Sequence, residues 1–171
     1  MAAGNSSGKT ADFVMSRVFD APRDLMWKVW TDPRHLTQWW GPKGFTITNL
    51  TNDPRPGGIM HYRMNLPNGD TWWGKFAYRE VVRNERLVFI NSFSDPEANT
   101  VRAPFEEKWP LEMLTTITFE AEGDRTKITV RWQPLNADAE EIATFDKNRD
   151  SMRGGWTGTM DQLADYLKRT K

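Results

Sequence analysis

The stretch DAEEIATFDKNRDSMRGGWTGTMDQLADYLK, residues 138–168, decides the fold of this chain. Its apolar residues recur every three or four positions, which is the spacing of one face of an α-helix. That stripe consists of Ile142, Phe145, Met152, Trp156, Met160, Leu163 and Leu167. A long helix with one apolar stripe has to bury that stripe against another element. The remainder of the chain must therefore supply a partner surface.

The same helix contains a pair of glycines, Gly154 and Gly155, in its middle. A glycine inside a helix costs up to about 1 kcal/mol relative to alanine. The pair therefore predicts either a bend or a place where the backbone comes close to a neighbouring element or a ligand.

The partner surface is a predicted β-sheet. Short runs rich in β-branched and aromatic residues, separated by turn residues, predict strands. The expected strands are residues 12–19, 44–51, 58–66, 71–82, 86–93, 113–121 and 125–132. Short turns between consecutive strands favour antiparallel pairing, and helices grouped at the ends of the strand run favour an α+β fold. Two short helices are expected at 22–31 and 34–39, and residues 94–111 are expected to form a long surface excursion, as lids and disordered loops do.

Alternating side chains indicate which face of the sheet points inward. Met60, Tyr62 and Met64 share one face of their strand, and Trp132 shares a face with Ile128 and Val130. A sheet of this kind buries one face only. Such an aromatic and methionine set is typical of an ordinary core. The nine tryptophans of the chain and the glycine pair favour a cavity between sheet and helix instead.

Composition sets limits on function. The chain has 171 residues, which fits one domain at 12–171 after a polar, disordered tail at 1–11. Lys and Arg number 23, as do Asp and Glu, and this balance argues against a nucleic-acid partner. No apolar run approaches the roughly 20 residues of a membrane span, and no signal peptide precedes the domain. We therefore expect a soluble, cytoplasmic protein, either a monomer or a homodimer.

Metal and redox chemistry find little support in the sequence. There are no cysteines, so disulfides and thiolate metal sites are excluded. The two histidines, His35 and His61, have no clustered carboxylates beside them, and we expect neither a metal site nor a cofactor.

Several short motifs, taken in order, carry a family resemblance. They are Phe19-Asp20-Ala21-Pro22-Arg23, Val29-Trp30-Thr31-Asp32-Pro33, Gln38-Trp39-Trp40-Gly41-Pro42, Arg55-Pro56-Gly57-Gly58, Glu85-Arg86-Leu87-Val88-Phe89 and Gly155-Trp156. The ordered set resembles the SRPBCC (START-type, helix-grip) superfamily. Within it, the chain is similar to the family named for the C-terminal domain of the activator of the heat shock protein 90 ATPase. The resemblance implies a bent seven-stranded antiparallel sheet wrapped around the long C-terminal helix, with a deep cavity between them.

Our leading hypothesis is a binding module for a small apolar or aromatic ligand in that cavity. The expected wall residues are Trp40, Phe45, Met60, Tyr62, Phe76, Tyr78, Phe89, Asn91, Trp132, Met152, Trp156 and Met160. The resemblance implies two alternatives. One is a cyclase- or dehydratase-like enzyme in the same cavity, with Tyr62 or Tyr78 as proton donor. The other is a stress-response protein with a chaperone partner.

Overall fold

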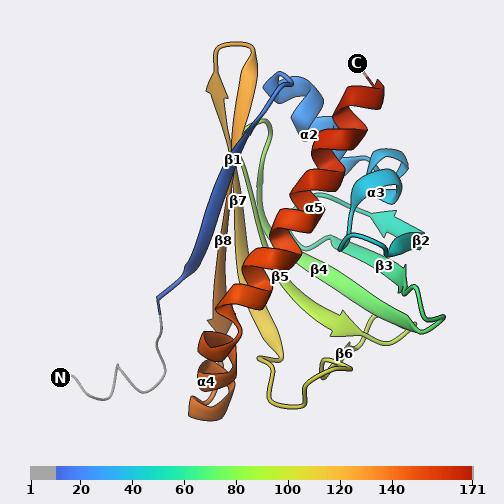
Figure 1. The fold of residues 1–171 in the computed structure, drawn as a ribbon, viewed down its shortest axis with the longest axis vertical. Coiled ribbons are helices and arrows are strands. Elements are labelled where there is room, and N and C mark those ends of the chain that lie inside the picture. Colours follow the sequence, from blue (N-terminus) through green and yellow to red (C-terminus); the bar gives the residue numbers. More distant parts are fainter. Residues whose placement is uncertain (1–10, 171) are drawn as a thin grey trace.

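The computed structural model describes residues 11–170 (Figure 1). Residues 1–10, which make up most of the predicted tail, and residue 171 lie outside the described residues. The elements in chain order are β1 (Phe13–Phe19), α2 (Arg23–Thr31), α3 (Pro33–Trp39), β2 (Thr46–Asn52), β3 (Ile59–Asn65), β4 (Thr71–Val82), β5 (Arg86–Ser94), β6 (Thr100–Val101), β7 (Glu112–Glu122), β8 (Arg125–Leu135), α4 (Ala139–Lys147) and α5 (Arg149–Thr170). The seven predicted strands and the two short helices are confirmed, with ends that shift by a few residues.

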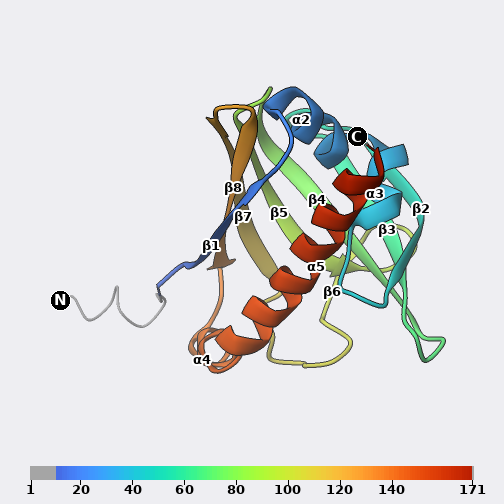
Figure 2. The same cartoon turned by 45° about the horizontal axis from the view of Figure 1, so that its top comes forward.

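All strand pairs are antiparallel, and the order across the sheet is β1-β8-β7-β5-β4-β3-β2, with the short β6 paired to β5. The predicted α+β helix-grip fold is therefore confirmed. The helix α5 lies diagonally across one face of the sheet, and no helix of residues 11–170 covers the opposite face (Figures 1 and 2). The side chains that alternate toward α5 form the core, while those on the opposite face are partly exposed.

The sheet bends where a loop binds the irregular part of β4. The register of β4 against β5 shifts between Tyr78 and Glu80. There the amide of Gly57 donates to the carbonyl of Tyr78, and the amide of Tyr78 donates to the carbonyl of Gly58. A Cβ atom on Gly58 would lie 2.0 Å from the carbonyl oxygen of Asp53, so only glycine fits this position. A register shift of this kind bends a strand and increases its twist.

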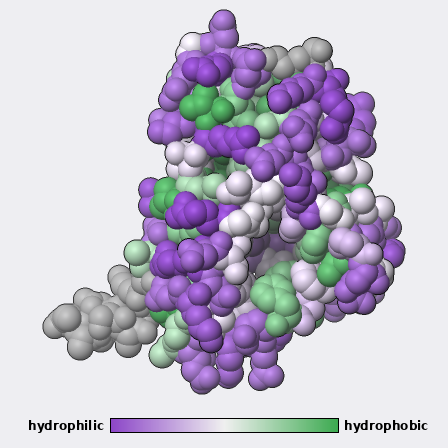
Figure 3. Space-filling model, in the orientation of Figure 1, coloured by the Kyte–Doolittle hydropathy of each residue, from purple (hydrophilic) through white to green (hydrophobic). Residues whose placement is uncertain are grey.

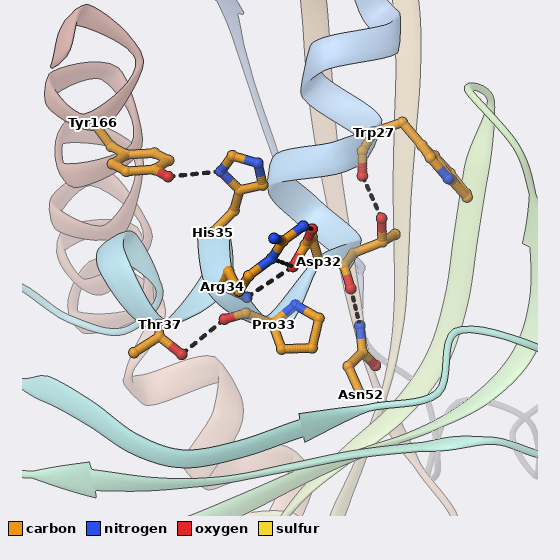
Figure 4. Close-up of polar contacts among 9 residues, drawn as sticks. Trp27, Asp32, Pro33, Arg34, His35, Thr37, Asn52 and Tyr166 are labelled. Carbon is orange, nitrogen blue, oxygen red and sulfur yellow. Dashed lines mark hydrogen bonds and ion pairs between the residues drawn. The ribbon is translucent and has the colours of Figure 1, made fainter. Parts of the chain in front are cut away.

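The helices α2 and α3 are joined at Asp32 and close one end of the sheet. The Asp32 carboxylate accepts a hydrogen bond from the backbone amide of Arg34 and caps α3 (Figure 4). The Arg34 side chain also binds it, and this hydrogen bond holds the pKa of the Asp32 carboxyl below its ordinary value. The side-chain amide of Asn52 on β2 donates to the backbone carbonyl of Thr31, which fixes the junction to the sheet.

The predicted C-terminal helix is divided in two, and this corrects its expected extent. Asp138 and Glu141 form a capping box that starts α4, and the helical geometry is interrupted at Asn148 before α5 begins. Gly154 and Gly155 lie inside the continuous α5. A Cβ atom at either glycine would meet no atom of another segment of residues 11–170 within 4 Å, so the described part of the chain does not approach the helix backbone closely there.

The predicted surface excursion at 94–111 is partly core, which is a second correction. It contains β6, and the side chains of Ala103 and Trp109 are buried. The guanidinium of Arg102 forms an ion pair with the buried carboxylate of Glu141 on α4. The segment is thus fastened at both its strand and its helix side. Phe105, by contrast, is 55% exposed.

Candidate ligand-binding cavity

A cavity of about 390 Å³ lies between α5 and the sheet. Figure 3 shows a recess on this face of the molecule, edged in part by hydrophobic residues, between α5 and the β4–β5 side of the sheet. The residues that form its walls come from β3, β4, β5, β7, β8 and α5, and from the segments before β2 and after β6. The cavity therefore belongs to the fold as a whole and not to one loop.

Nine of the twelve expected wall residues line this cavity. They are Trp40, Phe45, Tyr62, Phe76, Phe89, Asn91, Trp132, Met152 and Trp156. The structure brings them together from six separate segments of the chain. Whether they bind a ligand stays a prediction.

Three expected wall residues, Met60, Tyr78 and Met160, do not line the cavity, and their expected place is corrected here. All three face inward and are buried, as the alternation predicted, but they lie at the filled end of the sheet. The hydroxyl of Tyr78 donates to the side-chain oxygen of Asn52 at 2.9 Å. Alternation predicts which face a residue occupies, but it does not say how far along the strand the filled region extends.

Further wall residues escaped the expected set. They are Met64, Trp72, Phe93, Phe105, Trp109 and Met113, with several smaller residues. Trp72 and Phe93 share inward faces with predicted wall residues, so alternation could have identified them. Phe105 and Trp109 lie in the irregular segment after β6, where no periodic signal exists.

The aromatic walls contact one another in a continuous chain. Ring centroids lie 5.7 Å apart for Trp72 and Phe105, 5.9 Å for Phe105 and Trp109, and 6.3 Å for Trp109 and Trp132. Trp132 continues the chain to Trp156 on α5 at 5.8 Å. Tilted and edge-to-face contacts at these distances are favourable geometries for aromatic rings. The chain of rings connects the exposed Phe105 to the buried helix face.

Trp40 joins this chain at Trp156 and contacts three wall residues in all. Its ring lies 5.4 Å from Phe76, 5.8 Å from Trp156 and 6.2 Å from Tyr62. The Tyr62 ring packs directly on the backbone of Gly74, the residue paired with it on β4. A Cβ atom on Gly74 would lie 2.7 Å from the Tyr62 hydroxyl oxygen, so this strand position requires glycine for the ring to fit.

Polar groups in the walls are few. The Thr159 hydroxyl donates to the carbonyls of Gly41 and Gly155, and the side-chain amide of Asn148 donates to the carbonyl of Thr144. Burial raises the pKa of Tyr62 to about 12, although the neighbouring Trp40 indole offsets part of that rise. Tyr62 is therefore a neutral phenol at physiological pH.

Charge is missing from the walls. Within residues 11–170, no Asp, Glu, Lys, Arg or His side chain lines the cavity. His35 lies beside Tyr166 at the other end of α5, and the ring of His61 stacks on Trp73 on the sheet face that α5 does not cover. The described part of the chain contains no group of three or more His, Cys, Asp or Glu residues that could hold a metal ion.

Comparison with known proteins identifies the family of this chain. The family described as Activator of Hsp90 ATPase homolog 1-like protein matches residues 20–168. This chain belongs to that family. Its helix-grip fold is the one seen above, with α5 held against the bent sheet. Among curated proteins, no sequence matches this chain.

Several solved structures align with most of this chain and show the same fold. Protein Ms6760 from Mycobacterium smegmatis is 24% identical with a TM-score of 0.74, and the alignment covers 95% of this chain and 93% of that one. A protein from Arthrobacter aurescens is 25% identical with a TM-score of 0.76, over 92% and 86% of the two chains. The AHSA1 protein from Silicibacter pomeroyi is 18% identical with a TM-score of 0.73, over 94% and 100%. At these identities the likeness extends to the fold.

No helix in residues 11–170 combines the length and the apolar character that crossing a membrane requires.

Proposed function

We propose that this family member binds a small apolar or aromatic molecule in the cavity between α5 and the sheet. The observation that supports the proposal is a space of about 390 Å³ with aromatic and methionine walls. This volume falls within the range of small-molecule sites, which are mostly apolar with a few polar groups. Burial of apolar surface would drive binding, at about 25 cal/mol per Å² before the costs of association.

The glycine pair of α5 offers a direct test. Gly155 lines the cavity, and a Cβ atom there would meet no other atom within 4 Å. Gly155 is itself exposed, so the variant Gly155→Leu adds a large apolar side chain at the edge of the cavity without a clash at its Cβ. We expect it to fold and to weaken binding of naphthalene and of the neutral lipid monoolein by at least about tenfold, as measured by NMR titration.

Gly154 provides the matched control. It is the preceding residue in α5, its Cβ position is equally open, and it does not line the cavity. Leucine at either position favours the helix over glycine by about 0.8 kcal/mol, so both variants gain the same local stability. We expect Gly154→Leu to leave binding of both probes unchanged.

Two results would overturn the proposal. One is that neither probe, nor any member of a wider panel of neutral aromatic and lipid compounds, binds the wild-type protein. The other is that Gly154→Leu and Gly155→Leu weaken binding equally, because the probes would then occupy a place other than the cavity.

The chaperone partner and the enzyme remain predictions of the family resemblance. Of the two tyrosines expected as proton donors, only Tyr62 lines the cavity. No charged side chain among the described wall residues could exchange a proton with it. Both glycines are exposed, so a chaperone that uses a surface remote from α5 would bind Gly154→Leu and Gly155→Leu as well as wild type, whereas ligand binding would weaken in Gly155→Leu alone.

A further inference from the structure

The strand β1 forms one edge of the sheet, and its outer side pairs with no strand of residues 11–170 (Figure 1). Its inner side pairs with β8 over all seven residues without a register shift. On the sheet face turned away from α5, Val14 is 39% exposed, Val18 is 38% exposed, and the exposed Ser16 lies between them. A regular edge strand with exposed apolar side chains offers its free amide and carbonyl groups to another strand.

The opposite edge of the sheet, β2, is built differently. Its register against β3 shifts between Thr48 and Thr51, and Asn49 between them has a positive φ of 54°. Within Thr46–Asn52 no large apolar side chain is exposed. An irregularity of this kind hinders pairing with a further strand, so β2 is protected where β1 is open.

The inward face of β1 does not oppose such pairing either. Arg17 is the charged residue of Phe13–Phe19, and an inward-pointing charge on an edge strand usually discourages association. Its guanidinium, however, forms an ion pair with the Asp161 carboxylate of α5 at 2.7 Å. The charge is therefore compensated within the same molecule.

The sequence of β1 is symmetric about Ser16. With a two-fold axis at Ser16, an antiparallel second copy of the strand places Val14 of each copy opposite Val18 of the other. Side chains directly opposite one another in an antiparallel pair contact each other. A shift of the pairing by two residues either places Arg17 opposite Arg17 of the second copy or places Val14 opposite Ser16, and both shifts separate the valines. Apolar contact and charge thus favour the same register.

The neighbouring strand β8 adds cations that stay apart in this arrangement. Arg131 lies beside Val14, and Lys127 lies beside Val18. Each valine pair then lies between the arginine of one copy and the lysine of the other, and the aliphatic parts of these side chains can cover it. The two cations are three strand spacings apart, about 14 Å, which exceeds the screening length of about 8 Å at physiological salt.

From these observations we infer that β1 is a docking surface for a second copy of this chain, and that the two β1 strands pair antiparallel about Ser16 into one continuous sheet. The inference does not depend on ligand binding. One strand from each copy makes an interface smaller than the roughly 1,600 Å² of typical stable complexes. We therefore expect a weak dimer, with a dissociation constant of about 100 µM.

Charges at the two-fold axis test the inference. Ser16 is exposed, so Ser16→Glu and Ser16→Lys each add a charge at the surface of the single molecule. In the dimer each charge faces an identical charge, and we expect sedimentation equilibrium to show self-association at least about tenfold weaker than that of wild type. An equimolar mixture of the two variants should recover the wild-type affinity, because glutamate then faces lysine. Thr51→Glu, an exposed position on the opposite edge, is the matched control and should self-associate as wild type does.

Cysteine variants test the register. The chain contains no cysteine, so each substitution supplies the sole thiol of the molecule. Side chains opposite one another have Cβ atoms about 4.5–5.5 Å apart, which is close to the reach of a disulfide, and diagonal neighbours are about 7–8 Å apart. Under mild oxidation, Ser16→Cys should form covalent dimers. Val14→Cys and Val18→Cys should do so when mixed and much more slowly when alone, with one variant isotopically labelled so that mass spectrometry identifies the mixed species.

Three results would overturn the inference. The first is a wild-type protein that stays monomeric at about 1 mM, which would leave the edge to a strand of a different protein. The second is a wild-type dimer that Ser16→Glu does not weaken. The third is a Val14→Cys variant that cross-links alone as fast as in the mixture, since the strands would then not pair about Ser16. If circular dichroism shows that a charged variant does not fold, the wild-type protein and the cysteine variants still decide the question.

Discussion

The two halves of α5 pack against the same sheet but in different ways. The closed half, residues 160–167, buries Met160, Leu163 and Leu167 almost completely. The cavity half, residues 151–159, places Met152, Gly155, Trp156 and Thr159 along an open space. One helix thus serves as core at one end and as a cavity wall at the other.

The difference comes from the elements that lie beside each half. The helices α2 and α3 lie beside the closed half, where the Gln162 amide donates to the carbonyls of Trp39 and Gly41 (Figures 1 and 2). Among the described residues, the neighbours of the cavity half are the segment after β6 and the segment between α3 and β2, and neither is helical where it lines the cavity. We therefore expect core packing in the closed half to contribute more to stability than packing beside the cavity.

The largest expected effect is loss of core packing in the closed half. Leu163 is 0% exposed, and we expect Leu163→Ala to lower the free energy of unfolding by about 3 kcal/mol. Met152→Ala in the cavity half should cost about 1 kcal/mol, because a side chain beside an open space has fewer contacts to lose. Urea unfolding measures both. Equal losses would mean that the cavity half is packed as tightly as the closed half.

A second effect concerns alkaline pH. Burial raises the pKa of Tyr62 from 10.0 to about 12. Below pH 10 Tyr62 is protonated in both the folded and the unfolded state, so its full contribution to stability is present. As the pH rises from about 10 to 12 the unfolded state loses its proton first, so stability falls by about 2 kcal/mol from this group. Urea titrations over this range should show a shallower fall for Tyr62→Phe.

Tyr78 in the filled part of the sheet sharpens the same comparison. Burial also raises the pKa of Tyr78, while its hydrogen bond to Asn52 offsets part of the rise. Tyr78→Phe should likewise flatten the alkaline fall in stability. Because Tyr62 contributes to the raised pKa of Tyr78, a cavity ligand should change the titration of Tyr62 strongly and that of Tyr78 weakly. Equal changes at the two residues would show that the ligand does not act at the cavity wall.

Much of the fold follows from local patterns in the sequence. Helical spacing in 138–168, alternation in residues such as Met60, Tyr62 and Met64, and turn residues between strands each act over a few positions. The break at Asn148 was not predicted, because the apolar stripe keeps its phase across it. The ion pair of Arg102 and Glu141 joins α4 to the segment after β6, and a contact between residues so far apart in sequence leaves no trace in a local pattern.

The cavity was predicted in outline and not in extent. The large number of aromatic residues on inward faces of the strands predicts a cavity. The end of the cavity depends on where α2 and α3 lie along α5. Sequence patterns contain no information on that position, and Met60 and Met160 were therefore assigned to the wall. Trp109 was missed for the opposite reason, since an irregular segment brings it into the core.

A third prediction tests the fit at the cavity floor. An alanine Cβ at position 74 would lie 2.7 Å from the Tyr62 hydroxyl oxygen, so Gly74→Ala should displace the Tyr62 ring. Overpacking of this kind costs about 1–3 kcal/mol, and thermal unfolding should show the loss. Adding Tyr62→Leu to this variant removes the clash and should recover part of the stability. No recovery would mean that the β4 backbone, and not the ring, is the sensitive element.

The smallest expected effect lies at the far end of the closed half. The Tyr166 hydroxyl and Nδ1 of His35 lie 2.6 Å apart and share a hydrogen bond that joins α5 to α3 (Figure 4). Tyr166→Phe removes that bond and keeps the ring, so we expect a loss of about 1 kcal/mol in urea unfolding. Because this contact is remote from the cavity, affinity for naphthalene should stay unchanged. A weakened affinity would show that the position of α3 on α5 also sets the shape of the cavity, and the two halves would then act as one unit.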